Sequence, residues 1–273
     1  MKLRDHRPAW KPEYKHRRYG CRTQTRQAGS PLRKAACLFF WLLVWELAAR
    51  RIANTILLVS PLQTLTALWK LATEPSFWSS VLFSFVRITA GFLLALVTGI
   101  LLAVLSWLCP LIEELISPVL RLIKAIPVAS FIILALLWVS SRSLSVLISF
   151  LMVLPIVYTN LLAGIRETSQ ELLEMAQVFR ISLARRLRYL YLPAVLPYLL
   201  SACSVGLGLC FKSGIAAEII GLPSGSIGEK LYEAKLYLMT PELFAWTFVI
   251  VVISFLLEFV VIRIVRLLVK RFV

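Results

Sequence analysis

Histidine and aspartate are nearly missing from this chain of 273 residues. Both histidines, His6 and His16, and the single aspartate, Asp5, lie within the first 16 residues. Metal sites and acid–base catalysis draw mostly on histidine and on clustered carboxylates, so the rest of the chain offers few groups for either. The sequence therefore predicts no catalytic residue, no bound metal and no enzyme.

A phosphate-binding loop and a disulfide framework are missing as well. The pattern GxxxxGK[ST] does not occur, so we expect this chain to bind no ATP and no other cofactor itself. The five cysteines form no CxxC pair. Cys203 and Cys210 share a predicted helix at a separation of roughly 10 Å, which is too far for a disulfide. We interpret them as small packing residues.

Apolar residues are abundant, at 59% of the chain, and the mean hydropathy is +0.82. Soluble domains have about 45–50% apolar residues. The apolar residues fall in blocks that can cross hydrocarbon, which takes about 20 residues per helix. We therefore predict an all-α, polytopic transmembrane helical bundle of six spans, placed at residues 36–53, 81–108, 118–139, 144–165, 194–220 and 243–268.

Positive charge is also plentiful, with a net charge of +16. It gathers before residue 35, in the loop 166–188 and at the C-terminus, as the positive-inside rule predicts for a membrane protein, so we expect no nucleic-acid partner. Both termini and the 166–192 loop are then cytoplasmic. We predict a basic cytoplasmic tail, residues 1–34, that contacts anionic membrane lipids, and a membrane domain, residues 35–273. A start codon placed too early is the alternative origin of the tail.

Local signals add helices and helix contacts. Ser60 followed by Pro61 predicts a short outer helix, and the outer loop 221–242 is expected to turn helical from Ser226. Small residues at every fourth position predict close helix packing in two spans. These residues are Gly91, Ala95, Gly99 and Ala103, and Ala202, Gly206, Cys210 and Gly214.

Ionisable residues and prolines interrupt the apolar spans. Ionisable groups in hydrocarbon usually pair or face a watery cavity. Arg87 is close enough to the outer end of its span to reach the interface. For Lys212 two readings stay open: an ion pair with Glu46, or a place in a translocation path together with Glu218. Pro127 is a further candidate for that path, because proline kinks or breaks a helix. Pro155 predicts a kink in the fourth span.

The most informative segment is the charged insert at residues 171–193, which reads ELLEMAQVFRISLARRLRYLYLP. Thr168 followed by Glu171 is a capping-box pattern, so a helix is expected to start near Ser169. Ser182 can cap a second short helix, which Pro193 is expected to close. Two short helices at an angle form a compact knob. The alternative is an interfacial helix whose arginines bind lipid phosphates.

This insert resembles the EAA loop of permeases in binding-protein-dependent ABC importers. The motif starts with Glu-Ala-Ala, has a glycine further on and ends in Ile-x-Leu-Pro. Glu174-Met175-Ala176 stands for the first part here, and Leu190-Tyr191-Leu192-Pro193 stands for the last. Arg180 occupies the position of the glycine, so the tight turn between the two helices requires Arg180 to leave the helix.

The resemblance extends over residues 57–268. The segments LLVSPLQTL and SFVRITAGFLLALVTGILLAVL look like the sulfonate/taurine/nitrate branch, and KAIPVAS, LPIVYTNLLAGI and SGSIGEKLYEAK fit the family order. Two departures affect the segment after KAIPVAS. The family's second proline is missing, and its glycine-bearing outer loop reads VSSRS.

The resemblance implies a type I ABC importer permease in the inner (cytoplasmic) membrane of a bacterium. Such a permease translocates a small solute, here sulfonate-, taurine- or nitrate-like or a thiamine precursor, delivered by an extracytoplasmic binding protein. It works as a dimer, either a homodimer or a pair with a similar chain. Its coupling loop, residues 166–193, docks on a separate ATPase dimer that binds ATP and Mg²⁺. The residues of that contact are Glu171, Glu174, Ala176, Arg180, Leu192 and Pro193.

Three other classes compete with this interpretation. A secondary transporter would show inverted repeats with helix breaks in matching positions, and we recognise only unrelated proline breaks. A membrane-embedded enzyme would need clustered catalytic groups, which the composition lacks. A structural scaffold would leave the charged insert unexplained.

Overall fold

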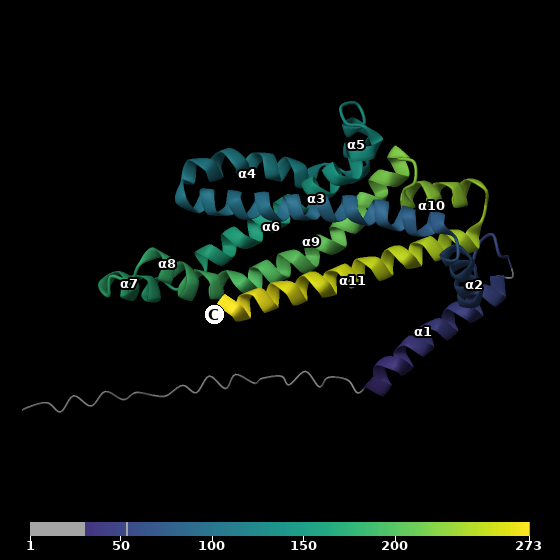
Figure 1. Cartoon of the computed structure of the whole chain (residues 1–273), viewed down its shortest axis with the longest axis horizontal. Helices are drawn as coiled ribbons and strands as arrows, with labels where there is room; N and C mark the ends of the chain where they lie inside the picture. The colour runs from purple at the N-terminus through teal and green to yellow at the C-terminus, as the bar shows by residue number, and fades with distance from the viewer. Residues whose placement is uncertain (1–30, 53, 273) are drawn as a thin grey trace, which may run out of the picture. The chain divides into compact units, whose positions relative to one another are not determined.

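The computed structural model describes residues 31–52 and 54–272, and in these residues the chain is helical without strands (Figure 1). Residues 1–30, which include His6, His16 and Asp5, lie outside the described residues. The described elements are α1 Pro31–Ile52, α2 Pro61–Ala72, α3 Pro75–Leu108, α4 Pro110–Ala125, α5 Val128–Ala135, α6 Ser141–Arg166, α7 Gln170–Val178, α8 Leu183–Arg186, the π-helical turn η1 Leu187–Tyr191, α9 Leu192–Gly221, α10 Ile227–Leu236 and α11 Thr240–Phe272.

The chain divides into two compact units, Met1–Val44 and Trp45–Val273. The described part of the first unit is the beginning of α1. The second unit holds the rest of the bundle, and the functional features described below all lie in it.

Four stretches in the described residues are long and apolar enough to cross a membrane. They are Pro75–Leu108, Ser141–Arg166, Leu183–Gly221 and Thr240–Leu267. The α4–α5 pair meets the same test as one broken span, which raises the number to five. The all-α membrane bundle is thus confirmed. The sixth span, at residues 36–53, stays a prediction, because α1 covers that region but also carries charged residues such as Arg50 and Arg51.

The centre of the second unit is built from α3, α6 and α9, which pack closely because of their small residues. A Cβ atom on Gly91 would lie 2.6 Å from the backbone oxygen of Val146 on α6. A Cβ on Gly214 would lie 2.7 Å from Cγ1 of Ile88 on α3. Every residue of the two predicted small-residue stripes is buried, so their role in helix packing is confirmed.

The third predicted span, residues 118–139, is wrong as a single helix. The helix α4 begins earlier, at Pro110, and α5 leaves it at an angle of 105°. Pro127 lies at the break, and it has no backbone N–H to continue the ladder of α4. The residue before a proline is driven out of the helical region, and Ile126 is extended at φ −74° and ψ 130°. Pro155, in contrast, lies within the continuous helix α6.

The short helices α2 and α10 follow their sequence signals. The Ser60 hydroxyl accepts a hydrogen bond from Gln63 N at 3.3 Å, and Ser60 N donates to Gln63 Oε1 at 3.2 Å. Ser226 caps α10 by accepting from Glu229 N at 3.0 Å. Both predicted helix starts are confirmed. Since α9 begins beside α8 and ends just before α10, α10 and the α7–α8 pair lie at opposite ends of the bundle (Figure 1).

Candidate functional sites: the knob and the α9–α11 groove

The knob, defined as residues 169–193, starts with α7. The predicted helix start near Ser169 is confirmed, since Ser169 Oγ accepts a hydrogen bond from Leu172 N at 3.4 Å. The predicted capping box of Thr168 and Glu171 is wrong. Thr168 is buried in the turn that closes α6, where its N–H bonds to Ile165 O and its hydroxyl has no hydrogen-bond partner among the described residues.

The turn after α7 holds Arg180 in the left-handed conformation, with φ 51°. Arg180 N donates to Gln177 O at 2.9 Å, and Ile181 N donates to Ala176 O at 2.9 Å. These two bonds define the Schellman motif, whose left-handed position is usually glycine. Arg180 therefore leaves the helix at the position where the motif has glycine, and the knob keeps its tight turn. A left-handed non-glycine residue costs about 1–2 kcal/mol.

Arg186, on the second helix, holds the turn from the other side. Its Nε donates to Ile181 O at 2.9 Å, and its Nη2 donates to Ala176 O at 3.1 Å. The last carbonyls of a helix have no intrahelical donor and attract cations, so this contact satisfies the C-terminal end of α7. This role of Arg186 was not predicted from the sequence. The available signal was an arginine that follows a predicted helix end by a few residues.

The second helix of the knob is not a separate piece. Pro193 was expected to close it, but α8, η1 and α9 form one continuous helix, Leu183–Gly221. Leu192 N donates to Leu187 O, one residue further back than in an α-helix. Pro193 then falls in the first turn of α9, where a missing N–H is tolerated. The π-helical turn thus accommodates Pro193 without a break in the helix, and the predicted helix end at Pro193 is wrong.

The knob's surface combines charged and apolar side chains. Four of the six expected contact residues are exposed, namely Glu171, Glu174, Arg180 and Pro193. Ala176 is fully buried, and Leu192 is partly buried. Around the Schellman turn three large apolar side chains are left uncovered, with exposures of 79% for Val178, 71% for Phe179 and 70% for Leu183. Exposed apolar patches with a polar rim are typical of docking surfaces.

A second candidate site is a groove of about 460 Å³ between α9 and α11. Lys212 and Glu258 both line it. The predicted ion pair of Lys212 with Glu46 is wrong, because Glu46 bonds to Arg50 one turn further along α1, at 2.7 Å. Glu258 accepts a hydrogen bond from Ser204 Oγ. Glu258 is not among the site residues predicted from the sequence, although a carboxylate inside a predicted span is a signal of function.

Glu218 lies apart from this groove and is fully buried, so the expectation that it points into protein is confirmed. Its Oε2 accepts from Ser84 Oγ at 2.6 Å and from Gly228 N at 3.3 Å. Ser84 Oγ in turn accepts from Ile227 N at 2.9 Å. A carboxylate at the N-terminus of α10 is favoured by the helix dipole, so Glu218 fastens α10 to α3 and α9.

Arg87 and Pro127 do not line the groove either. The Arg87 guanidinium carbon lies 4.1 Å from the centre of the Phe83 ring one turn earlier on α3. Pro127 lies exposed at the α4–α5 break.

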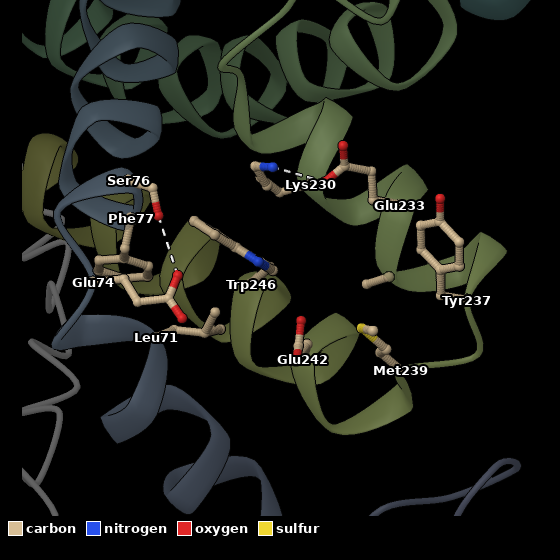
Figure 2. Close-up of a pocket in the computed structure, with 11 residues that line it drawn as sticks. Leu71, Glu74, Ser76, Phe77, Lys230, Glu233, Tyr237, Met239, Glu242 and Trp246 are labelled. Atoms are coloured by element: carbon tan, nitrogen blue, oxygen red, sulfur yellow. Dashed lines mark hydrogen bonds and ion pairs between the residues drawn. The ribbon is translucent and has the colours of Figure 1, made fainter.

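A pocket of about 260 Å³ opens at the end of the bundle opposite the knob, between α2, α3, α10 and α11. Figure 2 shows the Phe77 and Trp246 rings, which are tilted by 33° with centroids 4.8 Å apart, and the ion pair of Lys230 with Glu233, whose atoms are 2.7 Å apart. That hydrogen bond raises the pKa of Lys230 above its ordinary value. Two further carboxylates, Glu74 and Glu242, make this lining acidic and therefore unfavourable for an anion.

Long apolar helices, a surface knob between two of them and a charged groove in the membrane region define the class: a helical membrane transport subunit. The family comparison agrees. Residues 95–273 match the model of the binding-protein-dependent transport system inner membrane component, and the chain belongs to this family. It is a permease component of an ABC importer and an integral inner-membrane protein, and the other classes considered from the sequence are set aside.

Individual relatives and one structure extend the match. The chain is 28% identical over 230 residues to the taurine transport system permease protein TauC of Escherichia coli (strain K12), covering 82% of each chain. It is 25% identical over 214 residues to the putative aliphatic sulfonates transport permease protein SsuC of Bacillus subtilis (strain 168), covering 77% of each. These relatives are named as permeases, which are not themselves enzymes.

The fold is similar to a chain in the crystal structure of an amino acid ABC transporter with histidines. The TM-score is 0.53 at 17% sequence identity, and the match covers 72% of this chain and 94% of that one. At this identity the similarity concerns the fold alone.

Proposed function

We propose that this permease imports a small anionic or zwitterionic solute of the sulfonate, taurine or nitrate kind, using ATP hydrolysis by a separate subunit that docks on the knob. The names of the relatives support the solute class, since they include taurine, aliphatic sulfonate, nitrate and bicarbonate permeases. In this proposal the ATPase subunits bind ATP and Mg²⁺, and an extracytoplasmic binding protein delivers the solute at the α10 end.

The observation that carries the proposal is the architecture of the knob. Its turn keeps the left-handed geometry that the motif glycine provides, although the residue is Arg180. Arg186 holds the two helices together, while Val178, Phe179 and Leu183 stay uncovered. A surface with exposed apolar side chains, bordered by the carboxylates of Glu171 and Glu174 and by arginines, suits a protein partner that offers apolar side chains and both signs of charge.

The groove supports a second part of the proposal, the translocation path. Lys212 is exposed in this single chain, nine residues before the end of α9, which places it about 13 Å inside the span. A lysine at that depth costs at least about 2.5 kcal/mol in lipid, so protein or water must cover it. We propose that the groove faces the path, closed by a second copy of this chain. Glu218 and Pro127 remain candidates for that path.

Copurification tests the knob assignment. The tagged permease is coexpressed with its candidate ATPase and binding-protein partners, and the recovered ATPase is measured by quantitative mass spectrometry. We expect Glu174→Arg to lose most of the ATPase and of the ATP-driven uptake. Glu114→Arg, at a glutamate on α4 that is also exposed, serves as the matched control and should retain both.

Arg186→Gln adds a test of the knob's architecture. Loss of its two bonds to Ile181 O and Ala176 O should weaken ATPase recovery, while Arg185→Gln on the same short helix should leave it unchanged. For the Glu174→Arg variant described above, ATPase recovery and uptake at the wild-type level would refute the assignment of the knob as the coupling surface.

A further inference from the structure

The α9–α11 groove contains two opposite charges that do not pair with each other. Lys212 and Glu258 both line it, yet no ion pair joins them among the described residues. Opposite charges in a membrane region normally neutralise one another. Two opposite charges that line one groove without pairing leave room between them for a ligand that carries both a positive and a negative group.

The helix geometry sets the distance between these charges. The hydrogen bond from Ser204 fixes the Glu258 carboxylate next to residue 204 of α9. Lys212 follows Ser204 by eight residues, which is a rise of about 12 Å along the helix. Helical side chains lean toward the N-terminus, so the Lys212 ammonium leans back toward the carboxylate and shortens that distance.

The wall between the two charges is apolar and open. Gly208 lies between Ser204 and Lys212 on α9, and a Cβ atom added to it would meet nothing within 4 Å. Phe211 on α9 and Phe255 on α11 complete this part of the lining, and Ile215 continues it beyond Lys212. A short carbon chain fits such a wall, because it needs no hydrogen bonds.

We propose that this groove binds a small zwitterion, with its acidic group on Lys212 and its ammonium group on Glu258. An amine and an acid separated by two carbons lie about 4 Å apart. Two charge-assisted hydrogen bonds of about 2.8 Å extend the span to about 10 Å, close to the distance available. Ser204 is a positioning residue for Glu258. The inference rests on the proposed function and narrows its solute class.

A simple anion fits this groove less well. It would pair with Lys212 but offer no cation to Glu258. Arg263 and Arg266, which line the adjoining pocket with Glu258, form no ion pair with it among the described residues. The groove therefore favours an amino sulfonate or a similar amino acid over nitrate, bicarbonate or an alkanesulfonate.

A pair of matched probes tests this preference. The permease–ATPase complex in lipid nanodiscs, without binding protein, is titrated with radiolabelled taurine, and unlabelled ethanesulfonate, which lacks the amine, is used as competitor. We expect the wild type to bind taurine about tenfold or more tightly than ethanesulfonate, as one charge-assisted hydrogen bond allows. Glu258→Gln should weaken taurine binding about tenfold and leave ethanesulfonate unchanged, and Lys212→Gln should weaken both.

Ser204→Ala is the second variant, because it keeps both charges and only frees the carboxylate. We expect weaker taurine binding and unchanged ethanesulfonate binding. Each variant is first checked for copurification of the ATPase. Equal affinity of the wild type for both probes, no binding of either, or an equal loss of both with Glu258→Gln overturns the inference.

Uptake into proteoliposomes, measured with the binding protein present, distinguishes failure of this inference from failure of the proposed function. If the complex drives ATP-dependent uptake of sulfonates without any preference for the zwitterion, the inference falls and the proposed function stands. If no ATP-dependent uptake of any of these solutes occurs although the subunits assemble, the proposed function falls with it.

Discussion

At Arg180 the backbone conformation affects the stability of the turn more than the side chain does. Its φ of 51° suits glycine, and its side chain is exposed. We predict that Arg180→Gly stabilises the protein by about 1 kcal/mol, because it removes the left-handed strain. The thermal midpoint of the detergent-solubilised protein should rise by about 2 °C.

Arg180→Val provides the contrast, because a β-branched residue is poorly tolerated at positive φ. It should lower the midpoint, while ATPase recovery with the glycine variant stays at the wild-type level. A midpoint for Arg180→Gly below that of wild type would show that the arginine side chain itself supports the turn.

Glu218 acts through hydrogen bonds that a neutral residue can also accept. We predict that Glu218→Gln keeps the thermal midpoint near that of wild type, because an amide oxygen can accept from Ser84 Oγ and Gly228 N. Glu218→Ala should lower stability by about 1–3 kcal/mol, since it leaves buried donors unpaired. A strong loss of stability with glutamine would show that the negative charge at the start of α10 is what matters.

At the scale of elements, α3 and α6 depend on the close approach at Gly91. We predict that Gly91→Ala destabilises the bundle by about 1–3 kcal/mol, because its Cβ would meet the backbone oxygen of Val146 at 2.6 Å and the Cβ of Ser149 at 2.7 Å. Gly208→Ala is the matched control, since a Cβ there meets nothing within 4 Å. Thermal midpoints of both variants provide the measurement, and a neutral Gly91→Ala would contradict tight packing of these helices.

The sequence predicted elements well where a local signal decides the structure. The helix starts at Ser60, Ser169 and Ser226 follow from cap chemistry, and the small-residue stripes identify the packed faces. Prediction from the sequence failed where the structure depends on a distant contact or where one residue is compatible with two conformations. Pro127 was compatible with a kink or a full break, and composition does not distinguish them.

The same limit applies to the knob and to the intramembrane charges. A π-helical turn can absorb a proline, so Pro193 did not end a helix. The residues that share the groove with Lys212 depend on which faces of α9 and α11 meet, and that is set by packing of the whole bundle rather than by any local pattern. Glu46 instead forms an ion pair with Arg50, four residues further along α1.

At the scale of the whole molecule, the proposed orientation puts the knob in the cytoplasm and α10 outside. We predict that, in a cysteine-free background, Val178→Cys on the knob reacts with a membrane-impermeant maleimide only in inside-out vesicles. Lys235→Cys on α10 should react only in right-side-out vesicles. Both positions are exposed in the protein, so a position that does not react must be shielded from the reagent by the membrane.

A solubilised sample, in which both cysteines should react, is the control for folding and exposure. Labelling of both positions from the same side would contradict a membrane crossing by Leu183–Gly221, and reversed labelling would contradict the cytoplasmic placement of the knob.

The unbroken helix Leu183–Gly221 has a mechanical consequence. Its 39 residues correspond to a rod of about 58 Å that starts in the knob, passes Lys212 and ends at α10. A rod of that length turns a tilt of about 5° at one end into a displacement of about 5 Å at the other. If the ATPase docks on the knob as proposed, its push reaches α10 through this helix, because Glu218 ties the far end to α10. Bending at the π-helical turn or at Pro197 would shorten that displacement.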